Sequence, residues 1–329
     1  MTRPRSQLVS LDATPYYHCM SRCVRRAWLC GKDPLSGRSF DHRKGWLVER
    51  LALLGSIFAI NIAAYAVMSN HFHLVLHIDQ QRARRWSDDE VLYRWTRLYK
   101  GPPLVKRYLA GSSLMQAERA ELKGMIRAIR AKLSNISSFM AALNVSIARR
   151  ANIEDECTGR FWEGRFSSKA LLDMTGVLSC MSYVDLNPVR AGIAEGLEDS
   201  DFTSIQDRIL ALQGAVQAEK THKPASPTPL VKPVLMAFSD TEQDNDGAAV
   251  LPFRTKDYIE LTEWTGRCIR GDKTGYIAAN IPPILESLGI SPGQWQVLAL
   301  QVQKQSISML NGLDALAKHE RRAAKRKGA

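Results

Sequence analysis

The sequence has no long apolar run and no apolar leader. No hydrophobic stretch approaches the roughly 18 to 20 residues needed to cross a bilayer, although hydrophobic residues make up 45% of its 329 positions. Residues 1–10 lack the apolar centre of a signal peptide. We therefore expect a cytoplasmic protein with no membrane partner, whose apolar residues form a sizeable core.

The sequence also lacks the cysteine spacings of disulfide or zinc frameworks. Its six cysteines follow no repeated spacing and include no Cys-x-x-Cys pair. Disulfides are not expected in a cytoplasmic chain of this size. His18, Cys19, Cys23 and Cys30 could be drawn as a zinc site, but we interpret these cysteines as reduced packing residues.

Acidic residues are too few to balance the basic ones, and the net charge is +12. A polyanion such as nucleic acid is therefore the expected partner. In residues 80–133 basic side chains alternate with tryptophan and tyrosine, a mixture that suits backbone phosphates and unstacked bases. The alternative is a solvated helical insertion whose aromatic residues pack inward. The basic residues are Arg82, Arg84, Arg85, Arg94, Arg97, Lys100, Lys106 and Arg107, and the aromatic ones are Trp86, Tyr93, Trp95, Tyr99 and Tyr108.

Two histidines stand inside an apolar segment, at His71 and His73. The apolar runs 60–67 and 72–78 flank a Ser-Asn break and predict two strands of one hairpin. Because side chains alternate along a strand, the two imidazoles share one face, where they can bind one divalent ion from two sides. The alternative is a pair of strand histidines bonded to backbone or water.

A second pair of polar residues, Tyr183 and Asn187, stands four positions apart on a predicted helix that starts near Asp173 or Thr175 and ends at Pro188. Each taken alone has an ordinary structural explanation. Together with the histidines, they offer a phenol nucleophile and an amide oxygen. Two imidazoles, an amide oxygen, phosphate oxygens and water form a plausible shell for Mg or Mn, which would polarise a phosphate for attack.

Three motifs in this order resemble the single-tyrosine HUH transposases. They are Met-Ser-Asn-His71-Phe-His73-Leu, the Gly-Arg-Phe-Trp-Glu-Gly-Arg-Phe segment at 159–166, and Tyr183-Val-Asp-Leu-Asn187-Pro-Val-Arg-Ala-Gly. The transposases associated with repetitive extragenic palindromes, and those of the smallest bacterial insertion sequences, are the most similar. The resemblance covers about 15–210, interrupted by 80–133.

The resemblance implies an α+β, ferredoxin-like antiparallel sheet backed by helices, in agreement with the predicted order of strand, helix, strand, strand, helix and strand. It implies that His71, His73 and Asn187 hold a divalent metal, and that Tyr183 attacks single-stranded or hairpin DNA to form a 5′-phosphotyrosine. No ATP is needed, which agrees with the absence of a glycine-rich phosphate loop. A nucleoid-associated enzyme is implied, acting within one chain or as a homodimer.

Two features depart from this family. Arg22 continues into Cys-Val-Arg-Arg instead of a Gly-Asn turn, and the insertion and tail have no counterpart in compact members. Hairpin recognition by basic side chains is therefore a hypothesis for this chain, and it concerns Arg22, Arg25, Arg160, Arg165 and Arg190.

The expected organisation has four parts. Residues 1–79 and 134–212 form the transposase core, 80–133 a helical insertion, 213–250 a Pro-containing linker, and 251–329 a helical module with a basic tail. Helices are expected at 258–269, 281–288 and from 292 to about 316.

Two other functions remain open at this stage. A domesticated relative would nick and rejoin repeated hairpins without mobilising its own gene. A catalytically silent regulator would keep the fold and DNA binding, but it would have no need for all four of His71, His73, Tyr183 and Asn187.

Overall fold

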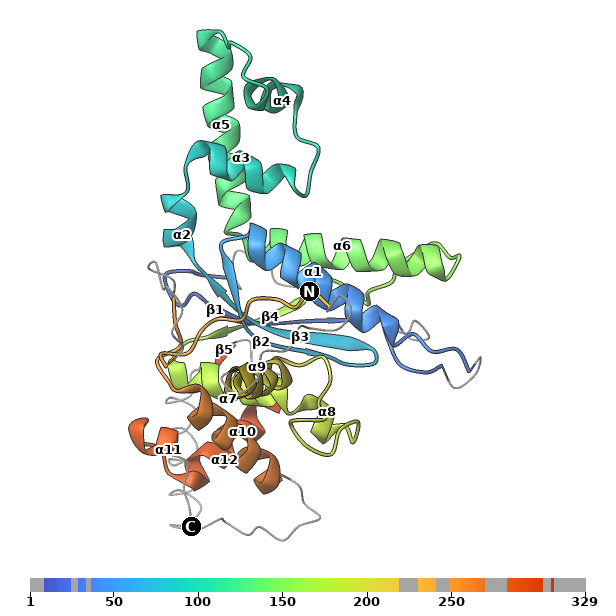
Figure 1. Cartoon of the computed structure of the whole chain (residues 1–329), viewed down its shortest axis with the longest axis vertical. Helices are drawn as coiled ribbons and strands as arrows, with labels where there is room; N and C mark the ends of the chain where they lie inside the picture. Colours follow the sequence, from blue (N-terminus) through green and yellow to red (C-terminus); the bar gives the residue numbers. More distant parts are fainter. Residues whose placement is uncertain are drawn as a thin grey trace, which may run out of the picture.

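The computed structural model describes residues 9–24, 29–33, 37–218, 230–240, 249–269, 283–303 and 309–310. The chain begins with β1 (Tyr16–Arg22), α1 (His42–Ile57), β2 (Ile60–Val67) and β3 (His71–Ile78). After an inserted helical segment it continues with α6 (Ile136–Glu154), β4 (Ser167–Leu171) and α7 (Met174–Asp185). Figure 1 shows a central sheet with helices on both faces.

The sheet has the strand order β2-β3-β1-β4, and these four strands are antiparallel. Together with α1 and α6, this is a β-α-β-β-α-β arrangement consistent with the predicted ferredoxin-like sheet. A short fifth strand, β5 (Met309–Leu310), pairs in parallel with β4. The last predicted helix differs here, because α12 (Pro292–Gln303) ends before these two residues, which extend the sheet instead.

The two faces of the sheet carry different side chains. On one face Phe72, Leu74 and Leu76 join an apolar core with α1 and α6. On the other face α7 packs over Val75 and the small side chains of β2. Strand alternation produces this separation, because His71, His73 and Val75 leave β3 on the side opposite to Phe72 and Leu74.

Side-chain caps start α6 and α7. The Asn135 side chain accepts from the Ser138 amide and opens α6, and Asp173 accepts from the Gly176 amide at 2.6 Å and opens α7. Each bond satisfies one of the backbone donors left over in a first helical turn. The cap at Asp173 fixes where α7 begins on the sheet, and therefore which of its residues face the histidines.

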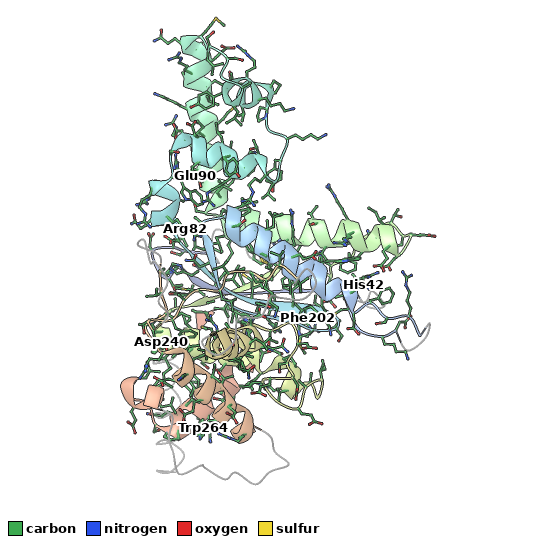
Figure 2. All side chains as sticks on the ribbon, viewed as in Figure 1. His42, Arg82, Glu90, Phe202, Asp240 and Trp264 are labelled. Carbon is green, nitrogen blue, oxygen red and sulfur yellow. The ribbon has the colours of Figure 1, made fainter. Side chains whose placement is uncertain are left out.

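The insertion forms an arm that projects from the α1 and α6 side of the sheet (Figure 1). It contains α2 (Gln80–Arg85), α3 (Asp88–Thr96), α4 (Pro103–Leu109) and α5 (Gln116–Leu133). Apolar residues of α3 and α4 pack against one side of α5 and continue the core of α1 and α6. The other side of α5 is exposed, so the arm is a folded extension with a solvent-facing helix (Figure 2).

The C-terminal half packs beneath the sheet. It contains α8 (Asn187–Arg190), α9 (Ser204–Ala218), α10 (Thr255–Ile269), α11 (Pro283–Ser287) and α12. Helices α10 and α12 contact α7 and share its apolar core. The described parts of the expected linker, 213–250, are not extended throughout: residues 213–218 complete α9, and the Met236 amide donates to the Ile62 carbonyl at 2.8 Å. None of the helices in the described ranges combines the length and hydropathy needed to cross a membrane.

A buried carboxylate joins α7 to this C-terminal half. Asp185 accepts hydrogen bonds from the Tyr258 hydroxyl of α10 at 2.5 Å and from the Ser204 hydroxyl of α9 at 2.5 Å. The Ile205 amide donates to the same carboxylate at 3.1 Å. Burial raises the pKa of Asp185 to about 6, against the stabilising effect of these donors on its charged form. Asp185 therefore fixes α7 to two helices that follow it in the chain.

Candidate active site

The predicted histidine pair lies on the sheet face covered by α7. His71 begins β3 and is partly exposed, and His73 is buried with 1% of its surface accessible. Their ring centroids are 4.9 Å apart and the rings meet edge to face. The structure therefore places both imidazoles on one face, as strand alternation predicts.

Tyr183 comes from α7 and meets this pair. Its ring centroid is 5.6 Å from that of His73, with the two rings nearly perpendicular. The side chain is only partly buried. Residues that are 110 positions apart in the chain are thus brought into contact by the packing of α7 on β3.

Asn187 lies one turn beyond Tyr183, but on a new helical segment. The predicted single helix differs from the structure, where α7 ends at Asp185 and Asn187 begins α8. Pro188 explains the interruption, because proline has no amide hydrogen to donate to the carbonyl four residues earlier. The Asn187 side-chain nitrogen instead donates to the Tyr183 carbonyl at 2.8 Å and approaches the Val184 carbonyl at 3.5 Å. Its amide oxygen remains the atom suited to bind a cation.

His18 is a third histidine in the site. It lies on β1, and its Nε2 is 2.9 Å from Nδ1 of His73 in a buried hydrogen bond. The two rings are nearly parallel, with centroids 5.1 Å apart, and the His18 ring centroid is 6.2 Å from that of Tyr183. Sequence reasoning considered His18 only as a zinc ligand with nearby cysteines. The sequence predicts that His18 lies in the first strand, but it does not predict that this strand pairs with β3.

The three imidazoles are held in their neutral form. Burial lowers the pKa of His18 to about 3 and that of His71 to about 4, and it lowers the pKa of His73 well below its usual value. The nearby charges of Lys169 and Arg22 act in the same direction. Neutral imidazole is the form that binds metal ions.

The residues fit a divalent ion with mixed nitrogen and oxygen ligands. His73 Nε2 is a buried atom with no hydrogen-bond partner, and His71 Nδ1 is 2.6 Å from the Asn70 side-chain oxygen. An acceptor at Nδ1 favours the tautomer whose Nε2 is free to bind a metal. Within the described ranges no group of three or more His, Cys, Asp or Glu side chains could hold a metal ion. A third protein ligand would therefore be of another type, as Asn187 is.

Two of the predicted arginines flank the tyrosine. Arg190 of α8 places its guanidinium carbon 5.3 Å from the Tyr183 ring centroid, and Arg22 is paired with His71 in the sheet register. Burial raises the pKa of Tyr183, and the charges of Arg190 and Arg22 oppose that rise. The two arginines therefore favour the phenolate form of Tyr183 against the effect of burial.

The other predicted arginines are less closely placed. Arg160 and Arg165 are exposed on the loop 157–166, which bonds to the end of β1 through the Glu163 amide and the Arg22 carbonyl at 2.9 Å. They lie at the same end of the sheet as the site, but no contact joins them to Tyr183. Arg25 lies outside the described residues.

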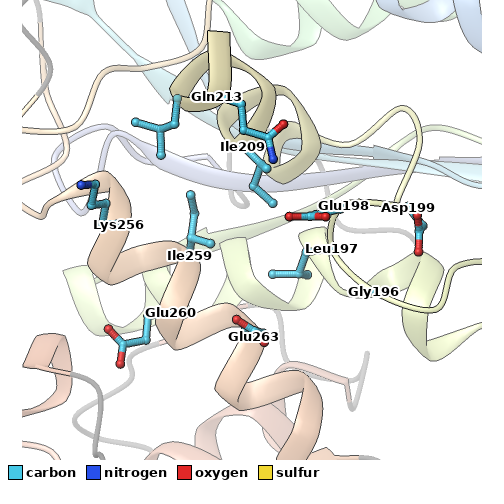
Figure 3. Close-up of a pocket in the computed structure, with 11 residues that line it drawn as sticks. Gly196, Leu197, Glu198, Asp199, Ile209, Gln213, Lys256, Ile259, Glu260 and Glu263 are labelled. Carbon is cyan, nitrogen blue, oxygen red and sulfur yellow. The ribbon is translucent and has the colours of Figure 1, made fainter. Parts of the chain in front are cut away.

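A separate cavity of about 570 Å³ lies between α9, α10 and the loop 196–199. Figure 3 shows Glu198, Glu260 and Glu263 around it, with Ile259 at its wall. It contains none of the histidines and not Tyr183. Carboxylates repel a phosphate backbone, so we exclude this cavity as the nucleic-acid site.

In the arm, most aromatic residues pack against neighbouring side chains, whereas most charged residues are exposed. The aromatic residues therefore follow the interpretation of a helical insertion, while the exposed charges fit both interpretations. Trp86 packs under Arg94 with 4.3 Å between the guanidinium carbon and the ring centroid, and Trp95 and Tyr99 pack together at 4.2 Å. The Tyr108 hydroxyl donates to Asp89 at 2.7 Å. The aromatic residues thus stabilise the arm, apart from Tyr93, which is 60% exposed. The charged residues mostly face solvent.

No family model matches the sequence, and no curated protein matches it. Among solved structures, the chain is similar to a REP-associated tyrosine transposase bound to a REP hairpin. The identity is 10% and the TM-score 0.35, and the similarity covers 67% of this chain and 92% of that chain. It is a distant likeness.

Proposed function

We propose that the protein is a metal-dependent transposase of the HUH type that cleaves and rejoins single-stranded DNA at hairpins. The observation that carries this proposal is the contact of Tyr183 with His73, at a ring distance of 5.6 Å, while His73 in turn contacts His71. A phenol beside two neutral imidazoles and two arginines is a set of side chains that suits phosphodiester transfer.

The histidines and Asn187 are proposed to hold Mg or Mn. When bound, such an ion supplies charge that polarises the phosphate. His71 and His73 contribute neutral nitrogen donors from a rigid strand, and Asn187 contributes an amide oxygen. Arg22 and Arg190 are proposed to contact the non-bridging phosphate oxygens beside Tyr183.

Tyr183 is the proposed nucleophile. Its hydroxyl oxygen bonds to phosphorus and loses its proton to solvent, while the bond between phosphorus and the 3′ oxygen breaks and that oxygen takes up a proton. The products are a 5′-phosphotyrosine and a free 3′-hydroxyl. When a second 3′-hydroxyl attacks the phosphotyrosine, the phosphodiester is restored and the phenol released. The bond energy is conserved, so no nucleotide cofactor is required.

The arm is proposed to contact the DNA backbone. Residues 80–133 contain thirteen Lys and Arg residues and five Asp and Glu residues, a net charge of +8. This is two thirds of the net charge of the chain, which is +12. On α5, Arg119, Lys123 and Arg127 are exposed at intervals of four residues, and therefore follow one side of the helix. Such a row of charges binds phosphates without recognising bases.

The test is formation of a covalent protein–DNA adduct. The protein is incubated with single-stranded hairpin oligonucleotides, including the repeats that flank its gene, with Mg²⁺ or Mn²⁺, and products are separated on a denaturing gel. We expect a metal-dependent adduct that disappears in Tyr183→Phe. Tyr93→Phe is the matched control, because it removes the hydroxyl of an exposed tyrosine in the arm and should leave the adduct unchanged.

Two outcomes would change the proposal. Tight DNA binding with no adduct on any hairpin would favour the catalytically silent regulator. An adduct that persists in Tyr183→Phe would assign the nucleophile to another residue. Whether an active enzyme mobilises its own gene or only nicks and rejoins repeats is decided by the DNA that flanks the gene.

A further inference from the structure

We propose that His18 is a positioning residue for His73. In this assignment His18 Nε2 accepts a hydrogen bond from His73 Nδ1–H, which leaves the His73 Nε2 lone pair directed to a divalent cation. The inference rests on the proposed function in that the cation is the one assigned to the His71 and His73 pair. It adds a residue from a third element, β1, to that site.

The hydrogen bond itself limits the protonation of the two rings. His18 Nε2 and His73 Nδ1 are 2.9 Å apart and both residues are buried. One nitrogen must carry the hydrogen and the other must offer a lone pair. Both rings are buried, and burial disfavours a positive charge on either of them. Two neutral rings remain, with two alternatives for the hydrogen.

Burial of the outer nitrogens distinguishes the alternatives. If His18 donated, the neutral His73 ring would carry its hydrogen on Nε2, a buried atom with no partner. A buried donor without an acceptor is disfavoured, and a protonated nitrogen cannot bind a metal ion. If His73 donates, the hydrogen of His18 lies on its Nδ1, which is not among the buried atoms without a partner. The second arrangement leaves no buried hydrogen unpaired.

The strand register explains why His18 reaches His73. Met20 is directly opposite His73, and His18 is opposite Val75, so His18 and His73 are diagonal neighbours on one face. Histidine is long enough to span this diagonal. A hydrogen bond from a fixed strand to the second nitrogen of a metal-binding histidine sets both the ring orientation and the tautomer.

The first measurement determines the tautomer without metal. Long-range proton–nitrogen NMR spectra of protein labelled with ¹⁵N in its seven histidines distinguish protonated from unprotonated ring nitrogens, and His73→Gln assigns the His73 signals. We expect His73 to carry its hydrogen on Nδ1. A hydrogen on His73 Nε2 would overturn the proposal.

The second measurement is the affinity for Mn²⁺ alone, followed by the electron paramagnetic resonance signal of the free ion. We expect His18→Leu to weaken binding about 10- to 100-fold, as loss of such a partner typically does. His18→Gln should restore most of the affinity, because its amide oxygen can accept from His73. His77→Leu is the matched control on the same face of β3, and it should leave the affinity unchanged because His77 bonds to Asn61.

The outcomes separate this inference from the proposed function. If the unaltered protein does not bind Mn²⁺, the metal site falls, while the NMR spectra still determine the direction of the hydrogen bond. If the unaltered protein binds Mn²⁺ and His18→Leu binds it equally well, the positioning role is overturned and the proposed function stands. Equal losses in His18→Gln and His18→Leu would also overturn the acceptor role. If His18→Leu does not fold, His18→Gln and the NMR spectra decide.

Discussion

The two faces of the central sheet are built from the same strands but carry side chains of different chemistry. The face toward α1 and α6 contains Phe72 and Leu74 in an apolar core, while the face toward α7 contains His18 and His73, which Tyr183 of α7 contacts. Consecutive residues of β3 alternate between them. One strand therefore supplies both a rigid apolar anchor and a row of chemically active side chains.

This difference shows why the site tolerates buried polar groups. The face toward α1 and α6 buries Phe72, Leu74 and Leu76, and this burial stabilises the sheet that carries the histidines. On the other face, the backbone hydrogen bonds of β3 to its two neighbouring strands fix the spacing between the imidazoles of His71 and His73. Changes on the first face should mainly affect stability, and changes on the second should mainly affect chemistry.

The largest expected effect comes from the apolar face. Phe72 is fully buried and its ring meets that of Trp162 at 5.6 Å. Phe72→Ala should lower the free energy of unfolding by about 3 to 5 kcal/mol, because it removes a large buried ring and leaves a cavity. Denaturant unfolding followed by circular dichroism measures this. A loss below about 1 kcal/mol would contradict the proposed division between the faces.

The neighbouring residue should behave in the opposite way. His71→Ala removes a partly exposed ring, and we expect the free energy of unfolding to change by less than about 1 kcal/mol. Adduct formation should fall on the order of 100-fold, since the proposed metal site loses a ligand. The adduct assay and the unfolding measurement are made on the same preparation. Retained adduct formation would remove His71 from the metal site.

A pH-dependent effect is expected from Asp185, where α7 meets the C-terminal half. Its pKa is about 6 in the folded protein, above the ordinary value of 3.8, so the folded state binds the proton more tightly. Its contribution to stability is therefore complete below about pH 4 and is lost as the pH rises through about 6, by roughly 3 kcal/mol.

Asp185→Asn should remove that dependence. Comparison of denaturant unfolding at pH 4.5 and pH 7 for both proteins measures the difference. The variant should show a smaller change between the two pH values than the unaltered protein. Equal changes would show that another group titrates in this range.

The smallest effect is expected in the arm, far from the two faces. Replacement of Arg119, Lys123 and Arg127 by glutamine should weaken DNA binding similarly for all sequences. It should reduce the dependence of log affinity on log salt by about 2 to 3 units, close to one per lost phosphate contact. Fluorescence anisotropy at several salt concentrations gives the slope. The matched variant with lysine at positions 119 and 127 keeps the charge and should keep the slope, and a slope unaffected by glutamine would exclude the arm from DNA binding.

The sequence predicts local features of this molecule well and long-range ones less well. Helix α7 begins after Asp173, one of the two expected starting positions, because capping depends on residues within one turn. The alternation around His71 and His73 correctly predicts a shared face. The roles proposed for the site residues remain predictions, since geometry alone does not test chemistry.

Features that depend on pairing between distant segments were not predictable. The contact of His18 with His73 requires the β1 and β3 register, which no local pattern specifies. The C-terminal pairing of Met309 and Leu310 with β4 is likewise long-range, and local helical periodicity gave the opposite expectation.

The break at Leu186 is a local effect. Pro188 has no amide hydrogen to donate to the Val184 carbonyl, and the Asn187 side chain approaches that carbonyl instead.

The bonds of Asp185 to Ser204 and Tyr258 affect how truncated forms of this protein would behave. A chain that stopped before residue 255 would keep the histidines, the tyrosine and the arm. It would nevertheless leave the buried Asp185 carboxylate without its Tyr258 partner and uncover the far side of α7, the helix that carries Tyr183. Loss of activity in such a truncated chain would therefore not by itself assign the proposed chemistry to the deleted segment. Single-residue substitutions are the sounder way to test the proposed site.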